Sequence, residues 1–348
     1  MKIIIPLAGV GTRLRPHTYS KPKPLLHVAG KPVLGHILDK VKEELPEVNE
    51  IIFITGHLKE KIEEYVTTNY DFSCTFVEQH IKDGTAGAVK LAEPYVDEPV
   101  LIIFVDTIFD ADLGEIKKAD KEGIDGIIWV KEVEDYQRFG VVLHKNWFMT
   151  KSVEKPSEPI SKLANIGLYY ISDFKSLFKK IHVLYEKNIK TKGEYYLTDA
   201  FELMIQDKAK IKVIEVDGWY DCGKKETLLE TNRILLQKLD EQNKGKKVEE
   251  IQSNEHIKIE NSVIIPPVSI EEGVKIKNSI IGPYVSIAKD AEIDHCIIQD
   301  SIINEKASLS YIELSESIIG EQAIVSDSTK KLNVGDHSEI NIKNENYP

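Results

Sequence analysis

The first two-thirds of the chain alternate short apolar runs with segments of helical periodicity. The apolar runs are rich in β-branched residues, as expected of strands buried on both faces, and they span Lys2–Leu7, Glu50–Thr55, Val100–Val105 and Gly126–Val130. Amphipathic helices are predicted between and after them, at Val33–Leu45, Leu58–Val66, Asp173–Tyr185 and Glu226–Leu239. This alternation is typical of an α/β domain with a mostly parallel sheet covered by helices.

A polar, lysine-rich stretch, Asp240–Ser253, interrupts this pattern and has no apolar periodicity. We therefore expect a linker at 241–253, between an N-terminal domain of residues 1–240 and a C-terminal domain of residues 254–348. The helix before the linker carries a stripe that should be buried, made of Leu228, Leu229, Asn232, Leu235, Leu236 and Leu239.

Beyond the linker, aliphatic residues recur every six positions in short series. They are Ile270 and Ile276; Ile281, Ile287 and Ile293; Ile303 and Leu309; and Ile319 and Val325. A small or β-branched residue lies two positions before most of them. This period favours a short left-handed parallel β-helix, whose stacked coils present inward aliphatic side chains. An irregular all-β sandwich is the alternative, because the register slips between the series.

The composition is that of a folded protein and restricts the possible ligands. Of the 348 residues, 42% are hydrophobic and 29% are charged, and 45 Lys and Arg against 57 Asp and Glu give a formal net charge of -12. This charge argues against nucleic acid or an anionic membrane as a partner. Phosphates would need a local cluster of cations and backbone N–H groups.

The sequence indicates neither a cysteine framework nor a targeting segment. Cys74, Cys222 and Cys296 are far apart and form no CxxC motif, so neither zinc nor a disulfide framework is expected. No run approaches ~18 apolar residues, and Met1-Lys2 leads directly into an apolar strand without a cleavage site. We therefore expect a cytoplasmic protein.

A glycine-rich turn follows the first predicted strand. It reads Leu7-Ala8-Gly9-Val10-Gly11-Thr12-Arg13, and Lys23 follows ten residues later. Glycines after a strand let backbone N–H groups approach phosphate oxygens without interference from a Cβ atom. The spacing matches neither the Walker loop nor the dinucleotide GxGxxG motif, and the two cations suit a triphosphate.

Residues 9–25 resemble the signature GxGTRLxPxT followed by KPKPL of the sugar-1-phosphate nucleotidylyltransferases. The resemblance covers about residues 1–240, and many members of that family carry a hexapeptide tail. It implies a Rossmann-like mixed, mostly parallel sheet of the GT-A-like type. It also implies a reaction that joins a sugar 1-phosphate to a nucleoside triphosphate and releases pyrophosphate. The nucleotide would be bound by Leu7, Ala8, Gly9, Gly11, Thr12 and Arg13.

The segment QHIKDGTAGAV, which begins at Gln79, bears on the nucleotide base. The resemblance implies that Gln79 and Gly84, with Thr85 beside them, hold the base. The Gln79 amide can both donate and accept, which suits the imide edge of a pyrimidine and hence dTTP or UTP. However, GTAGA also resembles mannose-1-phosphate guanylyltransferases, which usually carry an acidic residue in place of Gln79. The neighbouring Glu78 keeps GTP open.

Four further segments resemble elements that bind the sugar phosphate in this family. They are Arg138–Val142, Glu154–Pro156, Asn165–Tyr169 and Tyr195–Asp199, with Glu194 just upstream of the last. The resemblance implies that the sugar is contacted by Gly140, Glu154, Asn165 and Glu194, and that Lys155 holds its phosphate.

Two aspartates remote in sequence are the candidate metal ligands. Asp106 follows an apolar strand, at the end where ligands of open α/β sheets collect, although family members usually have glycine in place of Val105. Trp219–Gly223 resembles the family element WxDxG, whose aspartate, here Asp221, is the second ligand. Two close carboxylates repel each other unless a cation lies between them, and Mg²⁺ suits oxygen ligands that include phosphates.

The expected chemistry needs charge neutralisation rather than a general base, because the attacking phosphate oxygen is already anionic. Arg13 is expected to stabilise the departing pyrophosphate. Lys23 would span the nucleotide phosphates and the incoming group, while Lys155 holds the sugar phosphate.

Two other functions stay open. A non-catalytic regulatory subunit would lack a metal aspartate or a loop cation, all of which are present here. Acyl transfer by the β-helix would need a basic histidine, for which His295 and His337 are available, but the tail is short for that task. We therefore expect the tail to serve oligomerisation or regulation, in a homo-oligomer.

Overall fold

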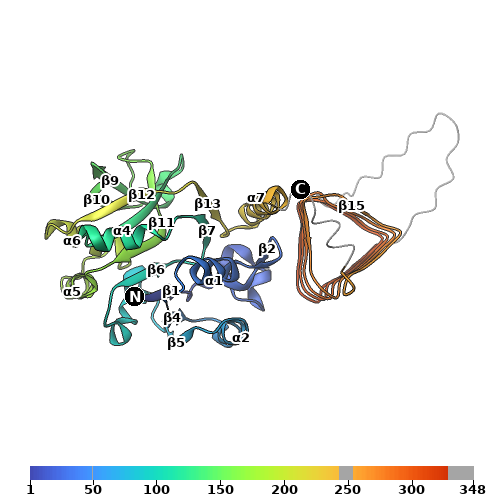
Figure 1. Cartoon of the computed structure of the whole chain (residues 1–348), viewed down its shortest axis with the longest axis horizontal. Coiled ribbons are helices and arrows are strands. Elements are labelled where there is room, and N and C mark those ends of the chain that lie inside the picture. The colour runs from blue at the N-terminus through green and yellow to red at the C-terminus, as the bar shows by residue number, and fades with distance from the viewer. Residues whose placement is uncertain (49, 243–253, 328–348) are drawn as a thin grey trace.

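The computed structural model describes residues 1–48, 50–242 and 254–327. Figure 1 shows an α/β domain formed by the blue-to-yellow part of the chain and a triangular coil formed by the orange part. Helix α7 (Lys225–Gln242) lies between them. Residues 243–253 of the predicted linker lie outside the described residues, so the linker stays a prediction.

In the described part of the chain, the N-terminal domain contains a nine-stranded sheet in the order β5-β4-β1-β6-β11-β8-β12-β10-β9. Its strands are β1 (Lys2–Pro6), β4 (Glu50–Thr55), β5 (Ser73–Glu78), β6 (Val100–Ile103), β8 (Gly126–Glu132), β9 (Gly140–Lys145), β10 (Phe148–Glu154), β11 (Leu163–Ile171) and β12 (Ile211–Glu215). The pairings β5–β4, β4–β1, β1–β6 and β12–β8 are parallel, and those of β10 and β11 are antiparallel. The predicted Rossmann-like mixed sheet is confirmed. It is less parallel than predicted, because four pairings of the described strands are parallel and five are antiparallel, the latter gathered in the second half.

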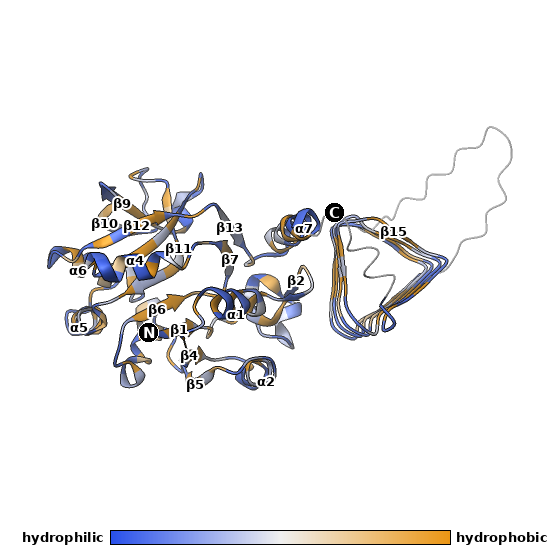
Figure 2. Ribbon diagram, viewed as in Figure 1, coloured by the Kyte–Doolittle hydropathy of each residue, from blue (hydrophilic) through white to orange (hydrophobic). Residues whose placement is uncertain are grey.

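Both faces of this sheet are covered by helices. Alternate residues of a strand point to opposite faces, so Ile3 and Ile5 of β1 pack in one core and Ile4 in the other. Helices α1 (Val33–Glu44), α2 (Lys59–Asn69) and α4 (Glu115–Glu122) contribute to the first core, and α3 (Thr85–Lys90), α5 (Phe174–Glu186) and α6 (Leu197–Gln206) to the second. Figure 2 shows orange, hydrophobic segments in the strands of the sheet and along parts of the helices.

The predicted elements form, but several of them end at other residues. Strand β6 ends at Ile103 rather than Val105, because the chain turns at Val105 and Asp106, after a last hydrogen bond from the Phe104 N–H to the Gly167 carbonyl of β11 (2.9 Å). Helix α5 begins after Asp173, whose carboxylate caps it by accepting from the Ser176 N–H (3.0 Å). Among the described residues, no helix combines the length and apolar character that crossing a bilayer requires.

The C-terminal domain is a parallel β-helix with three flat faces, seen end-on as a triangle in Figure 1. The first face contains β14 (Lys258–Glu260), β17 (Lys275–Lys277), β20 (Glu292–Asp294), β23 (Ser308–Ser310) and β26 (Ile324–Ser326). The second contains β15 (Val263–Ile264), β18 (Ile280–Ile281), β21 (Ile297–Ile298) and β24 (Glu313–Leu314), and the third β16 (Val268–Ile270), β19 (Val285–Ile287), β22 (Ile302–Ile303) and β25 (Ile318–Ile319). The predicted left-handed parallel β-helix, rather than a sandwich, is confirmed.

The slips in the six-residue pattern come from faces that span five residues. Ile276 pairs with Ile293, one coil of 17 residues later, whereas Ile293 pairs with Leu309 after 16 residues. Ile298, fully buried, follows Ile293 by five residues and therefore falls outside a strict six-residue series. Strands of successive coils still pair in register, although the coils differ in length by one residue. The β-helix therefore does not need a constant six-residue period.

Asn232 of α7 links the two domains through buried hydrogen bonds. Its side chain is 1% exposed, and its Oδ1 accepts from the Ala29 N–H (2.8 Å) and from the Ser286 hydroxyl (2.6 Å). Its Nδ2 donates to the Tyr284 carbonyl (3.2 Å). Ala29 belongs to the hairpin of β2 (His27–Val28) and β3 (Lys31–Pro32), which follows the glycine loop. The β-helix is therefore attached to the segment that carries Lys23.

Replacing Asn232 with Ala should destabilise the protein. The Ala29 N–H and the Ser286 hydroxyl would both stay buried without an acceptor, and each such loss costs roughly 1–3 kcal/mol. Urea unfolding followed by circular dichroism measures the change in unfolding free energy. Gln237→Ala, an exposed change on the same helix, is the control. Equal stability of the two variants would contradict the assigned role of Asn232.

Candidate active site

The loops expected to bind the nucleotide and the metal lie at the same edge of the sheet. Strands β1 and β6 run parallel, with Ile4 opposite Ile102. The Leu7–Arg13 loop and Asp106 follow the carboxyl ends of these strands and therefore lie side by side. Val105, which stands where the family usually has glycine, is buried in the turn before Asp106.

The glycine loop is shaped by its second glycine and open at its first. Gly11 has φ +66°, and a Cβ atom there would lie 3.0 Å from the Lys23 Cβ. The Thr18 hydroxyl donates to the Gly11 carbonyl (2.9 Å), which ties the loop to the segment that follows it. At Gly9 a Cβ atom would meet nothing within 4 Å, so the loop faces open space there.

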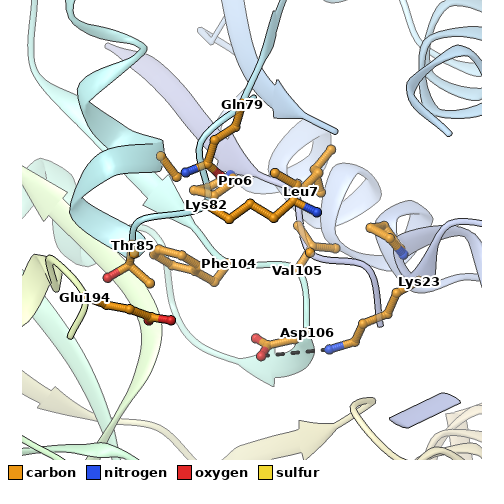
Figure 3. A pocket seen from close by; sticks show the side chains of 15 residues that line it. Pro6, Leu7, Lys23, Gln79, Lys82, Thr85, Phe104, Val105, Asp106 and Glu194 are labelled. Carbon is orange, nitrogen blue, oxygen red and sulfur yellow. Dashed lines mark ion pairs between the residues drawn. The ribbon is translucent and has the colours of Figure 1, made fainter. Parts of the chain in front are cut away.

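A first cavity, about 310 Å³ in volume, lies beside this loop (Figure 3). Its lining includes six residues predicted to bind the nucleotide, which are Leu7, Ala8, Gly9, Gln79, Gly84 and Thr85. Lys23 and Asp106 lie at one end of it, and Gln79, which is 7% exposed, lies at the other. Gly11 and Thr12, also predicted to bind the nucleotide, belong to the loop but do not line this cavity.

Gly84 and Thr85 are held by the segment before α6. Gly84 has φ +121°, and a Cβ atom there would lie 2.3 Å from the Tyr195 carbonyl oxygen, so a side chain does not fit. The Thr85 hydroxyl accepts from the Leu197 N–H (2.9 Å). The turn beside the first cavity is thus packed against the segment that also borders the second cavity.

A second cavity, about 550 Å³ in volume, adjoins the first, and Thr85, Phe104 and Asp106 line both. Its lining contains the predicted sugar-side residues Gly140, Glu154, Lys155 and Asn165, together with Arg13 and Asp221. The pairing of β11 with β8 shifts between Asn165 and Tyr169, and such an irregularity re-aims side chains. The Asn165 amide donates to the Gly140 carbonyl (3.0 Å) and its Oδ1 accepts from the Tyr169 hydroxyl (2.6 Å).

Asp106 and Asp221 are brought together by a two-stranded ribbon of β7 (Thr107–Asp110) and β13 (Gly218–Asp221). The antiparallel register sets Asp221 opposite Thr107, and the Cys222 N–H donates to the Asp106 carbonyl (2.9 Å). Both aspartates line the second cavity, so they do not point into separate spaces.

Each of these carboxylates has a cation close by. The Lys23 Nζ lies 3.9 Å from Asp106 Oδ2, and an Arg138 guanidinium nitrogen lies 3.8 Å from Asp221 Oδ2. These distances exceed hydrogen-bond length, so neither cation occupies the Oδ2 oxygen beside it, whereas Asp221 Oδ1 accepts from the Gly223 N–H (2.7 Å). The described residues contain no cluster of three or more His, Cys, Asp or Glu side chains suited to a metal. A hard cation here would take two carboxylates from the protein and the rest of its shell from phosphates and water, as Mg²⁺ does.

Glu154 and Lys155 form a coupled pair in the second cavity. Burial raises the pKa of Glu154, against the opposing effects of the Lys155 charge and the Thr198 hydroxyl, which donates to it (3.1 Å). Burial alone would lower the pKa of Lys155. The hydrogen bond that Lys155 donates to the Tyr196 hydroxyl (2.8 Å) and the charge of Glu154 outweigh this and raise the pKa. Lys155 is therefore a firmly charged group facing the cavity.

Four residues differ from the expectations or extend them. Glu194 lines the first cavity rather than the second, and Tyr196 lies in the second. Arg138, beside Asp221, and Lys82, in the first cavity, lie at the site without a predicted role. Both stand within motifs that resemble family elements, but only the folded chain reveals where their side chains lie.

Comparison with known proteins agrees with this geometry. Residues 2–238 match the nucleotidyl transferase family, and residues 239–310 match the family of GlmU-like C-terminal hexapeptides. The chain belongs to the nucleotidyl transferase family. Its membership rests on a match that spans more than half of the chain.

Several nucleotidyl transferase relatives have established names. The bifunctional protein GlmU of Methanocaldococcus jannaschii is 40% identical over 267 residues, which cover 76% of this chain and 61% of that protein. This nucleotidyl transferase thus spans less than two-thirds of the GlmU length. The UTP–glucose-1-phosphate uridylyltransferase AglF of Haloferax volcanii is 33% identical over 224 residues, covering 63% of this chain and 89% of that protein.

Solved structures show the same fold. A putative glucose-1-phosphate thymidylyltransferase from Bacillus anthracis superposes with a TM-score of 0.58 at 28% identity, covering 67% of this chain and 94% of that chain. A UDP-glucose pyrophosphorylase superposes equally well, with a TM-score of 0.58, but at 22% identity it supports the fold alone.

Replacing Glu154 with Gln should increase stability at neutral pH while weakening binding of the sugar phosphate. Because the pKa is raised on folding, the folded state loses stability as pH rises through the unfolded pKa, and the loss is complete above the folded pKa. The neutral amide removes this loss. In thermal unfolding, the melting temperature of the variant should therefore exceed that of the wild type by more at pH 8 than at pH 4. A lower melting temperature of the variant at pH 8 would contradict this expectation.

Proposed function

We propose that this nucleotidyl transferase moves a nucleoside monophosphate from dTTP or UTP to a hexose 1-phosphate, with glucose 1-phosphate as the first choice, and releases pyrophosphate. The observation that supports this most directly is the position of Asp106, in the lining shared by the two cavities. A triphosphate in the first cavity and a sugar phosphate in the second would meet there.

The charges around this junction fit such a meeting. All five charged residues expected to act line one of the two cavities, namely Arg13, Lys23, Asp106, Lys155 and Asp221. Lys23 would span the nucleotide phosphates and the incoming group, Lys155 would hold the sugar phosphate, and Arg13 would stabilise the pyrophosphate. A regulatory subunit has no need of this complete set.

A metal ion completes the proposal. The family is generally metal-dependent, and we propose Mg²⁺ at Asp106 and Asp221, because two carboxylates facing a phosphate-sized cavity match its preference for hard oxygen ligands. When bound, it would offset negative charge on the phosphate oxygens. The protein's own groups position both substrates. An oxygen of the sugar phosphate forms a bond to the α-phosphorus as the bond from that phosphorus to the pyrophosphate oxygen breaks.

The base preference rests on Gln79, which lines the first cavity and offers both a donor and an acceptor. The names of AglF and of the Bacillus anthracis protein specify UTP and a thymidylyl group with glucose 1-phosphate. GTP with mannose 1-phosphate is the second candidate, because Glu78 precedes Gln79 and an acidic residue is usual there in that branch. We also propose a cytoplasmic location, on the sequence features given above.

We also propose that the β-helix assembles copies of the chain rather than transferring acyl groups. On the outside of its second face, Val263, Ile280 and Ile297 stack in register and are 56%, 39% and 48% exposed. Such an aliphatic column is suited to a second copy of the chain. Acyl transfer would need a basic histidine. His337 lies outside the described residues. The ring of His295 stacks on Tyr311 of the neighbouring coil, and its Nδ1 lies 2.9 Å from Asp294 Oδ1, so this histidine is already engaged in contacts within the β-helix.

The function is tested by pyrophosphate release with UTP, dTTP, GTP and ATP, each against glucose 1-phosphate and mannose 1-phosphate. With the preferred pair, Asp221→Asn and Lys23→Ala should each lower kcat/KM by roughly two to three decades, because each removes one charge aimed at the reacting phosphates. Asp217→Asn, an exposed change near Asp221, is the control. Near-normal turnover by either site variant would refute these roles, and strict use of GTP would overturn the pyrimidine preference.

Assembly is tested by light scattering coupled to size-exclusion chromatography. Changing Val263, Ile280 and Ile297 together to Ser should lower the measured mass, because the apolar contact is lost. Lys275→Ser, on the outside of the first face, should leave the mass unchanged. A wild-type monomer, or an unchanged mass in the triple variant, would count against this surface.

A further inference from the structure

Lys82 is a cation in the first cavity that the proposed reaction does not use. It lies in the loop between β5 and α3, three residues after Gln79 and two before Gly84. Figure 3 shows its side chain extending across the cavity toward Leu7, on the same side as Gln79. Both side chains therefore face the space expected to hold the nucleotide base.

The Lys82 ammonium group has no hydrogen bond or ion pair with any residue that the structure describes. Other lysines nearby are paired. Lys59 lies 2.7 Å from Glu78, and Lys23 lies 3.9 Å from Asp106. An amine that lines a cavity and has no protein acceptor is free to donate to a ligand.

The position of Lys82 favours the base over the phosphates as its target. In Figure 3 the Lys23–Asp106 pair, beside which the phosphates are expected, lies at the opposite end of the cavity from Gln79 and Lys82. Lys23 and Arg13 already supply cations next to the glycine loop. The ligand atoms closest to Lys82 would therefore belong to the base.

Lys82 and Gln79 differ in what they can discriminate. A glutamine amide can rotate to present either its oxygen or its nitrogen, so it pairs with a carbonyl or an amino group. An ammonium group only donates. At C4 of the pyrimidine ring and C6 of the purine ring, uracil, thymine and guanine carry a carbonyl oxygen, which accepts, whereas cytosine and adenine carry an amino group, which donates.

We propose that Lys82 is a specificity-determining residue that selects nucleoside triphosphates with a keto base by donating to the exocyclic oxygen. Lys82 is exposed, and an amino base would place a donor, rather than an acceptor, against its ammonium group. This inference rests on the proposed nucleotidyl transfer. It keeps the candidate triphosphates UTP, dTTP and GTP and names the residue that would disfavour CTP and ATP.

The test compares kcat/KM for each keto triphosphate and its amino counterpart, UTP with CTP and GTP with ATP, in Lys82→Met and Lys82→Arg. Methionine keeps the apolar stem without a donor, and arginine keeps donors. Lys82→Met should lose roughly 10- to 100-fold with the preferred keto triphosphate, as expected for a hydrogen bond from a charged group, and change little with its counterpart. Lys82→Arg should retain most of the selectivity. Lys151→Met, an exposed change on β10 outside both cavities, should match the wild type.

Other outcomes would overturn the proposal. An equal loss with every triphosphate would assign Lys82 to the phosphates or the ribose. Unchanged selectivity would make it a solvent-facing lysine, and a wild-type preference for CTP or ATP would remove the basis of the idea while leaving the reaction intact. Calorimetric binding of UTP and CTP to the same variants tests Lys82 without turnover, so its failure is distinguishable from failure of the proposed function.

Discussion

The pairing of β7 with β13 is the contact on which the site depends. It holds two carboxylates from remote parts of the chain, Asp106 and Asp221, at the wall of one cavity. Like charges held together repel each other, and the molecule opposes this repulsion with cations at 3.8–3.9 Å, Lys23 and Arg138. A cation and phosphates bound there, as proposed, would add to the charges that offset the two carboxylates.

The overall acidity of the chain makes the local placement of cations decisive. With a net charge of -12, the protein as a whole repels phosphates, so binding has to come from a few lysines and arginines and from the glycine loop. Two contacts attach the segment that carries Lys23 to the β-helix. Asn232 accepts hydrogen bonds from Ala29 of that segment and from Ser286 of the β-helix, and Lys21 forms an ion pair with Glu321 (3.1 Å). The second domain therefore contributes to the rigidity of the first.

The second cavity is lined by polar groups that are costly to bury. Glu154 is kept as a buried carboxyl with a raised pKa, although a neutral side chain would be less costly to bury. A polar group of this kind is retained where it has to meet a ligand, and Gly140 fits the same logic, because a Cβ atom there would lie 2.2 Å from the Asn165 amide nitrogen. Close packing of polar groups around one space fits the sugar with several hydroxyl groups that is proposed to bind there.

Local features of the chain were readable from its sequence. Buried strands, amphipathic helices and the glycine loop depend on neighbouring residues, so their periodicity and spacing identified them, along with the β-helix repeat. Pairings between remote segments were not readable, because contact energies between distant residues leave no period in the sequence. Thus only the tertiary structure set β11 antiparallel to β6, put Ile298 in the β-helix core and placed Glu194 beside the first cavity. It also decided that Asp106 and Asp221 share a wall, since a backbone ribbon, and not sequence spacing, determines which carboxylates meet.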